Sequence, residues 1–342
     1  MDLLPSPDQL TIAEAAADVL LKELPVGAIL ERRGEESAIS ERAWRSCAET
    51  GLFGLGLPEP VGGAGCGLPE ETLLFREIGR HLAPGPFLAT VLAGHVALAS
   101  GDAGLAAGFA SGEVMAGLAD PEAGVPAEGL CLDGLVHVRD WAGTQWAVTV
   151  TEAGAGLVET QALGPVRGVR SIDPGVRTGT VMATALPFAR WVPAQHAAVF
   201  LRGLVLVAAQ LVGIAEACRD SSVHYAMTRE QFGRPIGVNQ AIKHACADMA
   251  VAAERASAQM LFAAASCESG RPDAEFQART AKVVASNAAR QNAAGNVQVH
   301  GGMGVTAEFS AHLFVERAEV LEQTLATRAE NLAAIISLPP PQ

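Results

Sequence analysis

Aromatic side chains are scarce in this chain: Phe, Trp and Tyr together make up 5% of the residues. Hydrophobic residues nevertheless account for 49% of the 342 residues, so aliphatic side chains and alanine must build the core. This composition excludes a disordered chain and favours close helix–helix packing over an aromatic-rich β-sandwich. Because the chain exceeds the size at which a single core stops growing, we expect two or three domains.

Basic residues are also in deficit. The formal net charge is −13 at pH 7 and the isoelectric point is near 5.1. A non-specific binder of nucleic acids or anionic membranes is therefore excluded, because no basic face is available in bulk. An anionic ligand held in a local basic pocket remains compatible with this charge.

Recognisable metal, redox and nucleotide motifs are missing. No C-x-x-C pair occurs, so we expect buried reduced thiols and neither a structural zinc site nor a disulfide framework. A G-x-G-x-x-G fingerprint after a strand and a P-loop are both absent. The six cysteines are Cys47, Cys66, Cys131, Cys218, Cys246 and Cys267.

A signal peptide and a membrane span are not indicated either. The N-terminal segment is acidic and begins an amphipathic helix. The apolar run from Phe200 to Leu211 is interrupted by Arg202 and is too short to cross a bilayer. These features predict a cytoplasmic protein with no membrane and no nucleic-acid partner.

Three segments differ in their hydrophobic pattern. Residues 1–112 show apolar positions at helical spacing, and residues 113–195 contain short β-branched stretches punctuated by glycine. Residues 196–342 return to the helical period in several long helices. The pattern predicts an α+β fold, mainly α, with an N-terminal helical domain, a small middle β domain and a C-terminal helical bundle.

The stretch TREQFGRPIG interrupts the helical pattern of the last segment, and its residues allow two interpretations. In the structural one, an arginine stabilises a helix C-terminus, Gly233 is an ordinary residue after a helix end, and Phe232 fills the joint. In the functional one, Arg229 presents its donors to an anionic group and Phe232 offers an apolar face to something planar.

The stretch QVHGGMG allows the same choice. It is compatible with a glycine-rich helix end, with His300 serving packing or capping. Alternatively, Gly301 and Gly302 let the backbone approach a ligand closely, with Gln298 supplying an amide one turn earlier.

Together these residues resemble the acyl-CoA dehydrogenase family. The family's helix–turn–helix pattern is matched by Arg229, Phe232, Gly233, Ile236 and Gln240. The family's later glycine-rich segment is similar to QVHGGMGVTAEF, and the stretch GLFGLGLPEPVGGAG resembles its N-terminal loop. The matched residues of the later segment are Gln298, Gly301, Gly302, Gly304 and Glu308.

The resemblance implies an FAD-dependent enzyme that oxidises the Cα–Cβ bond of an acyl-CoA thioester and assembles as a dimer or tetramer. It implies that the turn is a clamp reaching across a subunit interface to the diphosphate and adenosine of the neighbour's flavin. An acceptor of the electron-transfer flavoprotein type is compatible with it. The expected FAD-binding residues are Arg229, Phe232, Gln240, Gln298, Gly301 and Gly302.

The family's catalytic carboxylate has no counterpart at its usual places. Counting from the glycine pair leads to Leu325, and the alternative position at the start of the preceding helix corresponds to Gly203 and Leu204. Loss of a general base costs about 10²–10⁴-fold in rate. Glu322 lies one helical turn before Leu325 and is a weak candidate, since solvated helix charge is the simpler interpretation of Glu319 and Glu322.

Three hypotheses follow. In the preferred one, this chain completes the FAD site of a homologous partner in a heterotetramer and lacks its own base, as the resemblance to paired assemblies of bacterial steroid degradation implies. In the second, the chain is a self-sufficient homotetrameric dehydrogenase whose base has moved to Glu322. In the third, it is a non-catalytic scaffold or acyl-CoA binding protein, against which the retained clamp residues argue.

Overall fold

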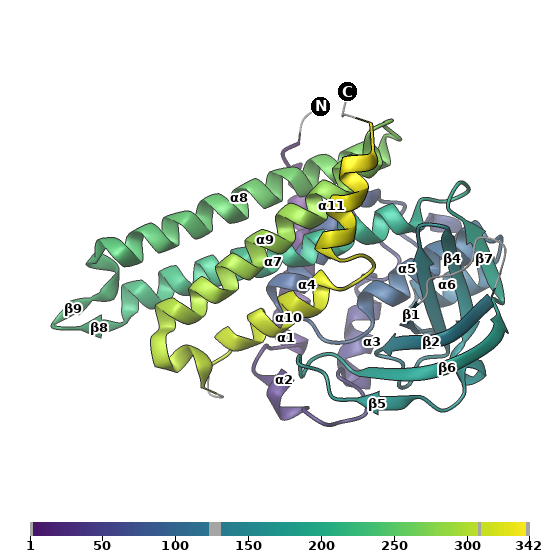
Figure 1. Ribbon diagram of the computed structural model, residues 1–342, viewed down its shortest axis with the longest axis horizontal. Coiled ribbons are helices and arrows are strands. Elements are labelled where there is room, and N and C mark those ends of the chain that lie inside the picture. Colours follow the sequence, from purple (N-terminus) through teal and green to yellow (C-terminus); the bar gives the residue numbers. More distant parts are fainter. Residues whose placement is uncertain (1–2, 123–130, 307–308, 340–342) are drawn as a thin grey trace. The chain divides into compact units, whose positions relative to one another are not determined.

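The computed structural model describes residues 3–122, 131–306 and 309–339. The chain forms two compact units, each described by itself. The helical unit comprises residues 1–17, 72–83 and 204–342, and the sheet unit comprises residues 18–71 and 84–203. The predicted α+β, mainly α class is confirmed, with every long strand inside the predicted middle segment (Figure 1).

The sheet unit contains a seven-stranded sheet in the order β5-β6-β2-β1-β3-β4-β7. Its pairs are antiparallel except that β1 lies parallel to β3. The strands are β1 (Ala116–Pro121), β2 (Cys131–Arg139), β3 (Trp146–Thr151), β4 (Gly154–Glu159), β5 (Arg167–Val169), β6 (Thr178–Pro187) and β7 (Arg190–Pro193).

A compact aliphatic core lies within this sheet. It includes Leu132, Val136 and Val158, all almost completely buried, and the half-buried Trp141 packs against them. Because an added Cβ at Gly179 would lie 3.0 Å from the Trp141 ring, the ring fills space inside the sheet unit. Trp141 therefore has a core role.

The helices of the sheet unit pack around a small aromatic group. The Trp44 ring stacks on Phe53 at 4.1 Å and lies 5.5 Å from Phe87, and its indole N–H donates to the carbonyl of Gly112 at 2.8 Å. These few aromatic residues thus add to a core that is otherwise mainly aliphatic. The helices are α2 (Ala28–Glu31), α3 (Glu41–Glu49), α5 (Phe87–Ala99) and α6 (Ala103–Ala110), while α1 (Pro7–Glu23) and α4 (Leu68–Arg80) contribute residues to both units.

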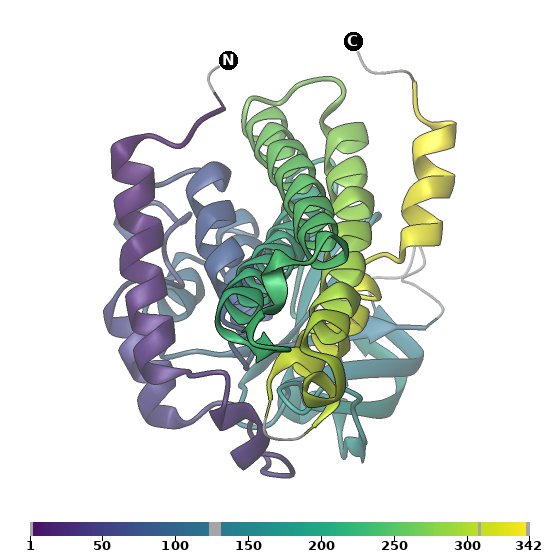
Figure 2. The same ribbon diagram turned by 90° about the vertical axis from the view of Figure 1, so that its left-hand side faces the viewer.

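Alanine-rich helices form the helical unit. Helices α8 and α9 run side by side in Figures 1 and 2, and alanines fill half of their buried positions. Small side chains allow close approach, so the interface needs few large residues. The helices are α7 (Val199–Thr228), α8 (Gln240–Glu268), α9 (Ala274–His300), α10 (Ala311–Glu322) and α11 (Arg328–Ser337).

Helix α7 extends well beyond the apolar run from Phe200 to Leu211 that is seen in the sequence. It is the one helix among the described residues that is long and apolar enough to cross a membrane. However, 83% of its most apolar window is buried inside the protein, as in the central helix of a packed bundle.

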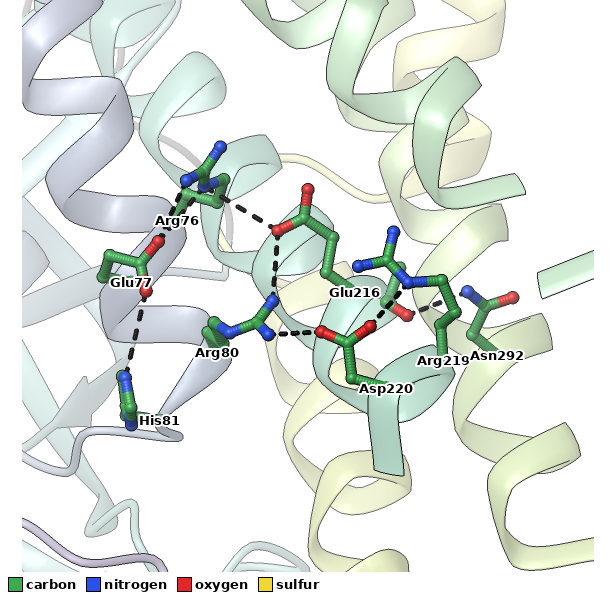
Figure 3. A network of polar contacts seen from close by, with 9 residues as sticks. Arg76, Glu77, Arg80, His81, Glu216, Arg219, Asp220 and Asn292 are labelled. Carbon is green, nitrogen blue, oxygen red and sulfur yellow. Dashed lines mark hydrogen bonds and ion pairs between the residues drawn. The ribbon is translucent and has the colours of Figure 1, made fainter. Parts of the chain in front are cut away.

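Helices α4 and α7 cross closely within the helical unit. A Cβ added at Gly79 would lie 2.0 Å from the carbonyl oxygen of Gln210. A Cβ added at Gly213 would lie 1.9 Å from the carbonyl oxygen of Arg76, so both positions need glycine. Around this crossing, arginines and carboxylates of the two helices form a network (Figure 3). Burial raises the pKa of Glu216 in this network, although Arg76 and Arg80 lie 3.7 and 3.5 Å from its carboxylate.

Candidate functional site

The TREQFGRPIG stretch forms a β-hairpin between α7 and α8. Strand β8 (Glu230–Gln231) pairs with β9 (Arg234–Pro235), and the two-residue turn between them is Phe232-Gly233. Both turn residues have positive φ, 55° and 76°, as two-residue turns that match strand twist require. The structure therefore corrects the interpretation of Gly233 as a residue closing a helix, because α7 has already ended at Thr228.

Phe232 occupies a costly conformation for a residue with a Cβ. A left-handed backbone costs such a residue about 1–2 kcal/mol, and its ring is 102% exposed, so no internal packing offsets this cost. The structural interpretation predicted that Phe232 fills the joint between helices, and this prediction is wrong. An exposed ring on a strained turn is typical of a residue that contacts another molecule.

Arg229 stands at the base of the hairpin with its position fixed by the backbone. Its N–H donates to the carbonyl of Tyr225 at 2.8 Å, and its carbonyl accepts from the N–H of Ile236 at 2.9 Å. Its side chain is exposed and makes no hydrogen bond or ion pair with any residue that the structure describes. The donors of this guanidinium are available to an external anion.

The start of α8 adds further donors. Gln240 is the first residue of this 29-residue helix and is exposed. The preceding residue, Asn239, makes no side-chain cap, so the first N–H groups of α8 are open at the positive end of the helix dipole. Such an end favours a phosphate group.

The end of α9 supplies the remaining predicted residues. Gln298 is exposed, and Gly301 adopts φ 60° and ψ −140°, a conformation that residues with a Cβ avoid. An added Cβ at Gly301 or Gly302 would meet no protein atom within 4 Å. Here the backbone is open to a ligand.

All six predicted FAD-binding residues lie at one end of the bundle, where Figure 1 shows the hairpin, the start of α8 and the end of α9. The same segments expose several large apolar side chains, a feature of surfaces that contact a partner. These are Val223, Met227, Phe232, Val238, Met303 and Val305. Glu308, which also matched the family pattern, lies outside the described residues.

Leu325, at one of the expected base positions, lies in a loop held from beneath by a buried lysine. The ammonium of Lys282, which is 0% exposed, donates to the carbonyls of Thr324 at 2.7 Å, Ala326 at 3.0 Å and Glu322 at 3.4 Å. Leu325 is half-buried with φ 67°. The loop is built and ordered, but its central side chain cannot accept a proton.

Glu322 is tied into the same loop. Its carboxylate accepts from the backbone N–H of Arg328 at 3.0 Å and from the side-chain amide of Gln323, and the residue is 7% exposed. Glu319 is part-exposed and pairs with Arg290 at 2.7 Å. The interpretation of Glu322 as a solvated helix charge is therefore wrong, because the residue is buried. The geometry favours structural roles for both carboxylates.

Gly203, at the other expected base position, is buried within α7, beside an arginine that is already engaged. Arg202 pairs with one carboxylate oxygen of Glu71, whose other oxygen lies 2.8 Å from Nε2 of His95. Burial acts to raise the pKa of Glu71, but the charges and hydrogen bonds of His95 and Arg202 outweigh it and hold that pKa below its ordinary value. Glu71 is thus an ionised carboxylate sealed inside the sheet unit.

This cluster was not predicted from the sequence. Its members come from three helices and are separated by 24 and 131 residues along the chain, so no local pattern indicates it. One indirect signal exists: at Gly56 an added Cβ would lie 2.1 Å from Glu71, so this glycine is needed to admit the carboxylate.

Family models match both ends of the chain. The acyl-CoA dehydrogenase N-terminal domain matches residues 6–108, and the acyl-CoA dehydrogenase C-terminal domain matches residues 195–324. The chain belongs to the acyl-CoA dehydrogenase family. Members of this family are oxidoreductases, and the match covers both the N-terminal loop and the candidate clamp.

Relatives support the same assignment over the full length. The acyl-CoA dehydrogenase IpdE2 of Mycobacterium tuberculosis is 31% identical over 341 residues, covering 97% of this chain and 98% of its own. The structure of the ChsE4-ChsE5 complex from Mycobacterium tuberculosis has a chain with a TM-score of 0.87 and 23% identity, covering 100% of both chains. Butyryl-CoA dehydrogenase from Megasphaera elsdenii has a TM-score of 0.83 at 20% identity, covering 98% of this chain and 99% of its own.

The residues at the hairpin end fit the diphosphate and adenosine of the family's flavin. Arg229 and the open start of α8 supply positive donors, Gln240 and Gln298 supply amides, and Gly301 leaves room for close approach. Among the described residues, no group of three or more His, Cys, Asp or Glu side chains is arranged to hold a metal ion.

Proposed function

We propose that this chain is a subunit of an FAD-dependent acyl-CoA dehydrogenase that completes the flavin site of a homologous partner and lacks a catalytic base of its own. The reaction is removal of a proton from Cα of an acyl-CoA thioester, with transfer of hydride from Cβ to the flavin. In this assignment the partner supplies the carboxylate base and the acyl pocket.

The observation that carries this proposal is the exposure of the candidate clamp. Arg229, Phe232, Gln240 and Gln298 are all exposed, and a strained turn holds Phe232 fully exposed. A small-molecule site formed by one chain is a concave cleft that buries most of the ligand, whereas these side chains are exposed at the end of the bundle. Donors displayed at the tip of a bundle, beside exposed apolar side chains, suit a ligand held mainly by a neighbouring subunit.

The state of the two base positions supports the second half of the proposal. Leu325 and Gly203 bear no ionisable group, and the nearby Glu322 accepts two hydrogen bonds that order its loop. A general base must reach the proton it removes. Glu322 would have to release Arg328 and Gln323 to do so.

Similarity to paired assemblies suggests the partner and substrate class. The ChsE4-ChsE5 structure is a complex of two different chains, and a Tcur3481-Tcur3483 steroid ACAD variant has a TM-score of 0.85 at 24% identity. We extend from these to a heterotetramer that acts on a bulky, steroid-derived acyl-CoA in the cytoplasm. An electron-transfer flavoprotein is the acceptor that suits such a dehydrogenase.

Purification with and without a partner tests the proposal. The chain is expressed alone and together with a homologous acyl-CoA dehydrogenase chain from the same organism, and flavin absorption near 450 nm is recorded. We expect a colourless chain alone and a yellow complex that an acyl-CoA bleaches. Flavin retention is measured before turnover, so the clamp and the chemistry are read separately.

Other outcomes assign the chain differently. A lone chain that is yellow and bleached by acyl-CoA is a self-sufficient dehydrogenase, and Glu322 becomes its leading base. A chain that retains no flavin, alone or with the partner, is a scaffold or acyl-CoA binding protein.

A further inference from the structure

Beneath the candidate clamp, a short chain of contacts links α7 to α9. The hydroxyl of Ser222 donates to Oδ1 of Asn296 at 2.9 Å, and both residues are completely buried. The carbonyl of Asn296 lies 2.8 Å from Nδ1 of His300. Because a carbonyl only accepts, Nδ1 of His300 carries the hydrogen in this bond.

An aromatic stack returns the link to α7. The ring of His300 lies 4.1 Å from the ring of Tyr225 at an interplanar angle of 26°, and Phe309 closes against both at 5.4 and 6.1 Å. Tyr225 and His300 are therefore held face to face, one on each helix. An offset stack of this kind contributes about 0.5–1.5 kcal/mol beyond its buried area.

The position of this link relates it directly to the clamp. Ser222 and Tyr225 are spaced by three residues on α7, and Arg229 follows Tyr225 by four residues, directly after the helix ends at Thr228. The carbonyl of Tyr225 accepts the N–H of Arg229, and His300 is the residue immediately before Gly301. Arg229 is thus bonded directly to the backbone of Tyr225, and Gly301 directly follows His300 in the chain.

We propose that Tyr225 and His300 are positioning residues of the clamp, which fix the separation between Arg229 and the Gln298–Gly302 backbone. This inference rests on the proposed function and adds two residues that touch no ligand. Without the stack, the ends of α7 and α9 would still fold, but their spacing would no longer be defined at the clamp.

Paired substitutions in the flavin-containing assembly test this role. Tyr225→Leu and His300→Ala remove the stack, whereas Tyr225→Phe keeps the ring and His300→Phe keeps the stack but loses the bond to Asn296. Phe262→Leu is the matched control, because Phe262 lies near the other end of α8, over Arg271. Each apo-assembly is titrated with FAD, and its melting temperature is recorded in the absence of FAD.

We expect Tyr225→Leu and His300→Ala to raise the FAD dissociation constant by about tenfold, the effect of misplacing one charge-assisted contact. Tyr225→Phe should retain the wild-type FAD affinity. Phe262→Leu should lower the melting temperature and leave the FAD affinity unchanged. The inference is wrong if Tyr225→Leu lowers the melting temperature and leaves FAD affinity unchanged.

Arg229→Ala separates this inference from the proposed function. If Arg229→Ala weakens FAD binding while Tyr225→Leu does not, the clamp is correct and the positioning role is wrong. If neither variant changes FAD affinity, the clamp itself is wrong, and the stack has nothing to position.

Discussion

The two regions of the helical unit that bear on catalysis are built in opposite ways. At the clamp end, the side chains of Arg229 and Phe232 are displayed to solvent and engage nothing within the described residues. At the base loop, buried donors bind the loop's carbonyls: Lys282 binds three of them, and Asn331 donates to those of Ala326 and Thr327 at 3.2 and 2.9 Å.

This difference separates retained function from retained structure. Exposed donors and a strained, exposed ring cost stability or contribute none, so their presence needs a use outside the chain. Buried, satisfied donors stabilise the fold whether or not a catalytic residue is present. The loop at Leu325 is held by internal bonds and bears no carboxylate at position 325, whereas the candidate clamp exposes donors that the fold does not use.

The strongest test of this contrast is the buried lysine. Lys282→Met removes the buried ammonium and its three bonds to loop carbonyls, and we expect a loss of about 3 kcal/mol in the free energy of unfolding. Urea unfolding measures it. Lys22→Met is the control, because Lys22 is 78% exposed in its ion pair with Glu23 and should change stability by less than about 0.5 kcal/mol.

At the clamp, the expected effect is on the ligand and not on the fold. Arg229→Ala removes a donor to the diphosphate and should weaken FAD retention in the assembly by about tenfold or more. The unfolding free energy should stay within about 0.5 kcal/mol of the wild type. Arg255→Ala, at an exposed arginine of α8 elsewhere on the bundle, should leave FAD retention unchanged.

The two left-handed residues allow a direct comparison of the regions. Phe232→Gly relieves backbone strain at an exposed position and should stabilise the chain by up to about 1 kcal/mol while lowering FAD retention. Leu325→Gly relieves similar strain but gives up a half-buried side chain, so its stability should change little and FAD retention not at all. Equal effects of both variants on FAD would contradict the contrast.

The smallest effect is expected at Glu322. Glu322→Gln keeps an oxygen that can accept from the N–H of Arg328, so unfolding should change by no more than about 1 kcal/mol. Turnover of the assembly should be unchanged if the base belongs to the partner. A drop of about 10²-fold or more in kcat would make Glu322 the base and return the chain to the self-sufficient class.

Much of the helical architecture could be predicted because its signals are local. The helical period of residues 196–342 and the short β-branched stretches of residues 113–195 agree with the helices and strands observed there. Strands β1 and β5 carry no clear strand pattern, for physical reasons. Strand β1 is buried on both faces and shows no alternation, while β5 is three exposed residues long.

The hairpin shows where a local signal misleads. A glycine after a helical run is usually a helix stop, but here the helix had ended earlier, and Gly233 serves a two-residue turn. The choice between these conformations depends on β8 and β9 pairing across the turn. Neither strand is long enough to show a pattern of its own.

By itself, the sequence determined the helical periods, the order of helical and strand-rich segments, and the absence of a carboxylate at positions 203 and 325, and it predicted the six clamp residues. Only the tertiary structure decided that Lys282 is buried, that Glu71 is sealed between His95 and Arg202, and that Tyr225 stacks on His300. The reason is physical: periodicity arises from neighbours along one helix, whereas the burial of a charge depends on partners that distant segments bring to it.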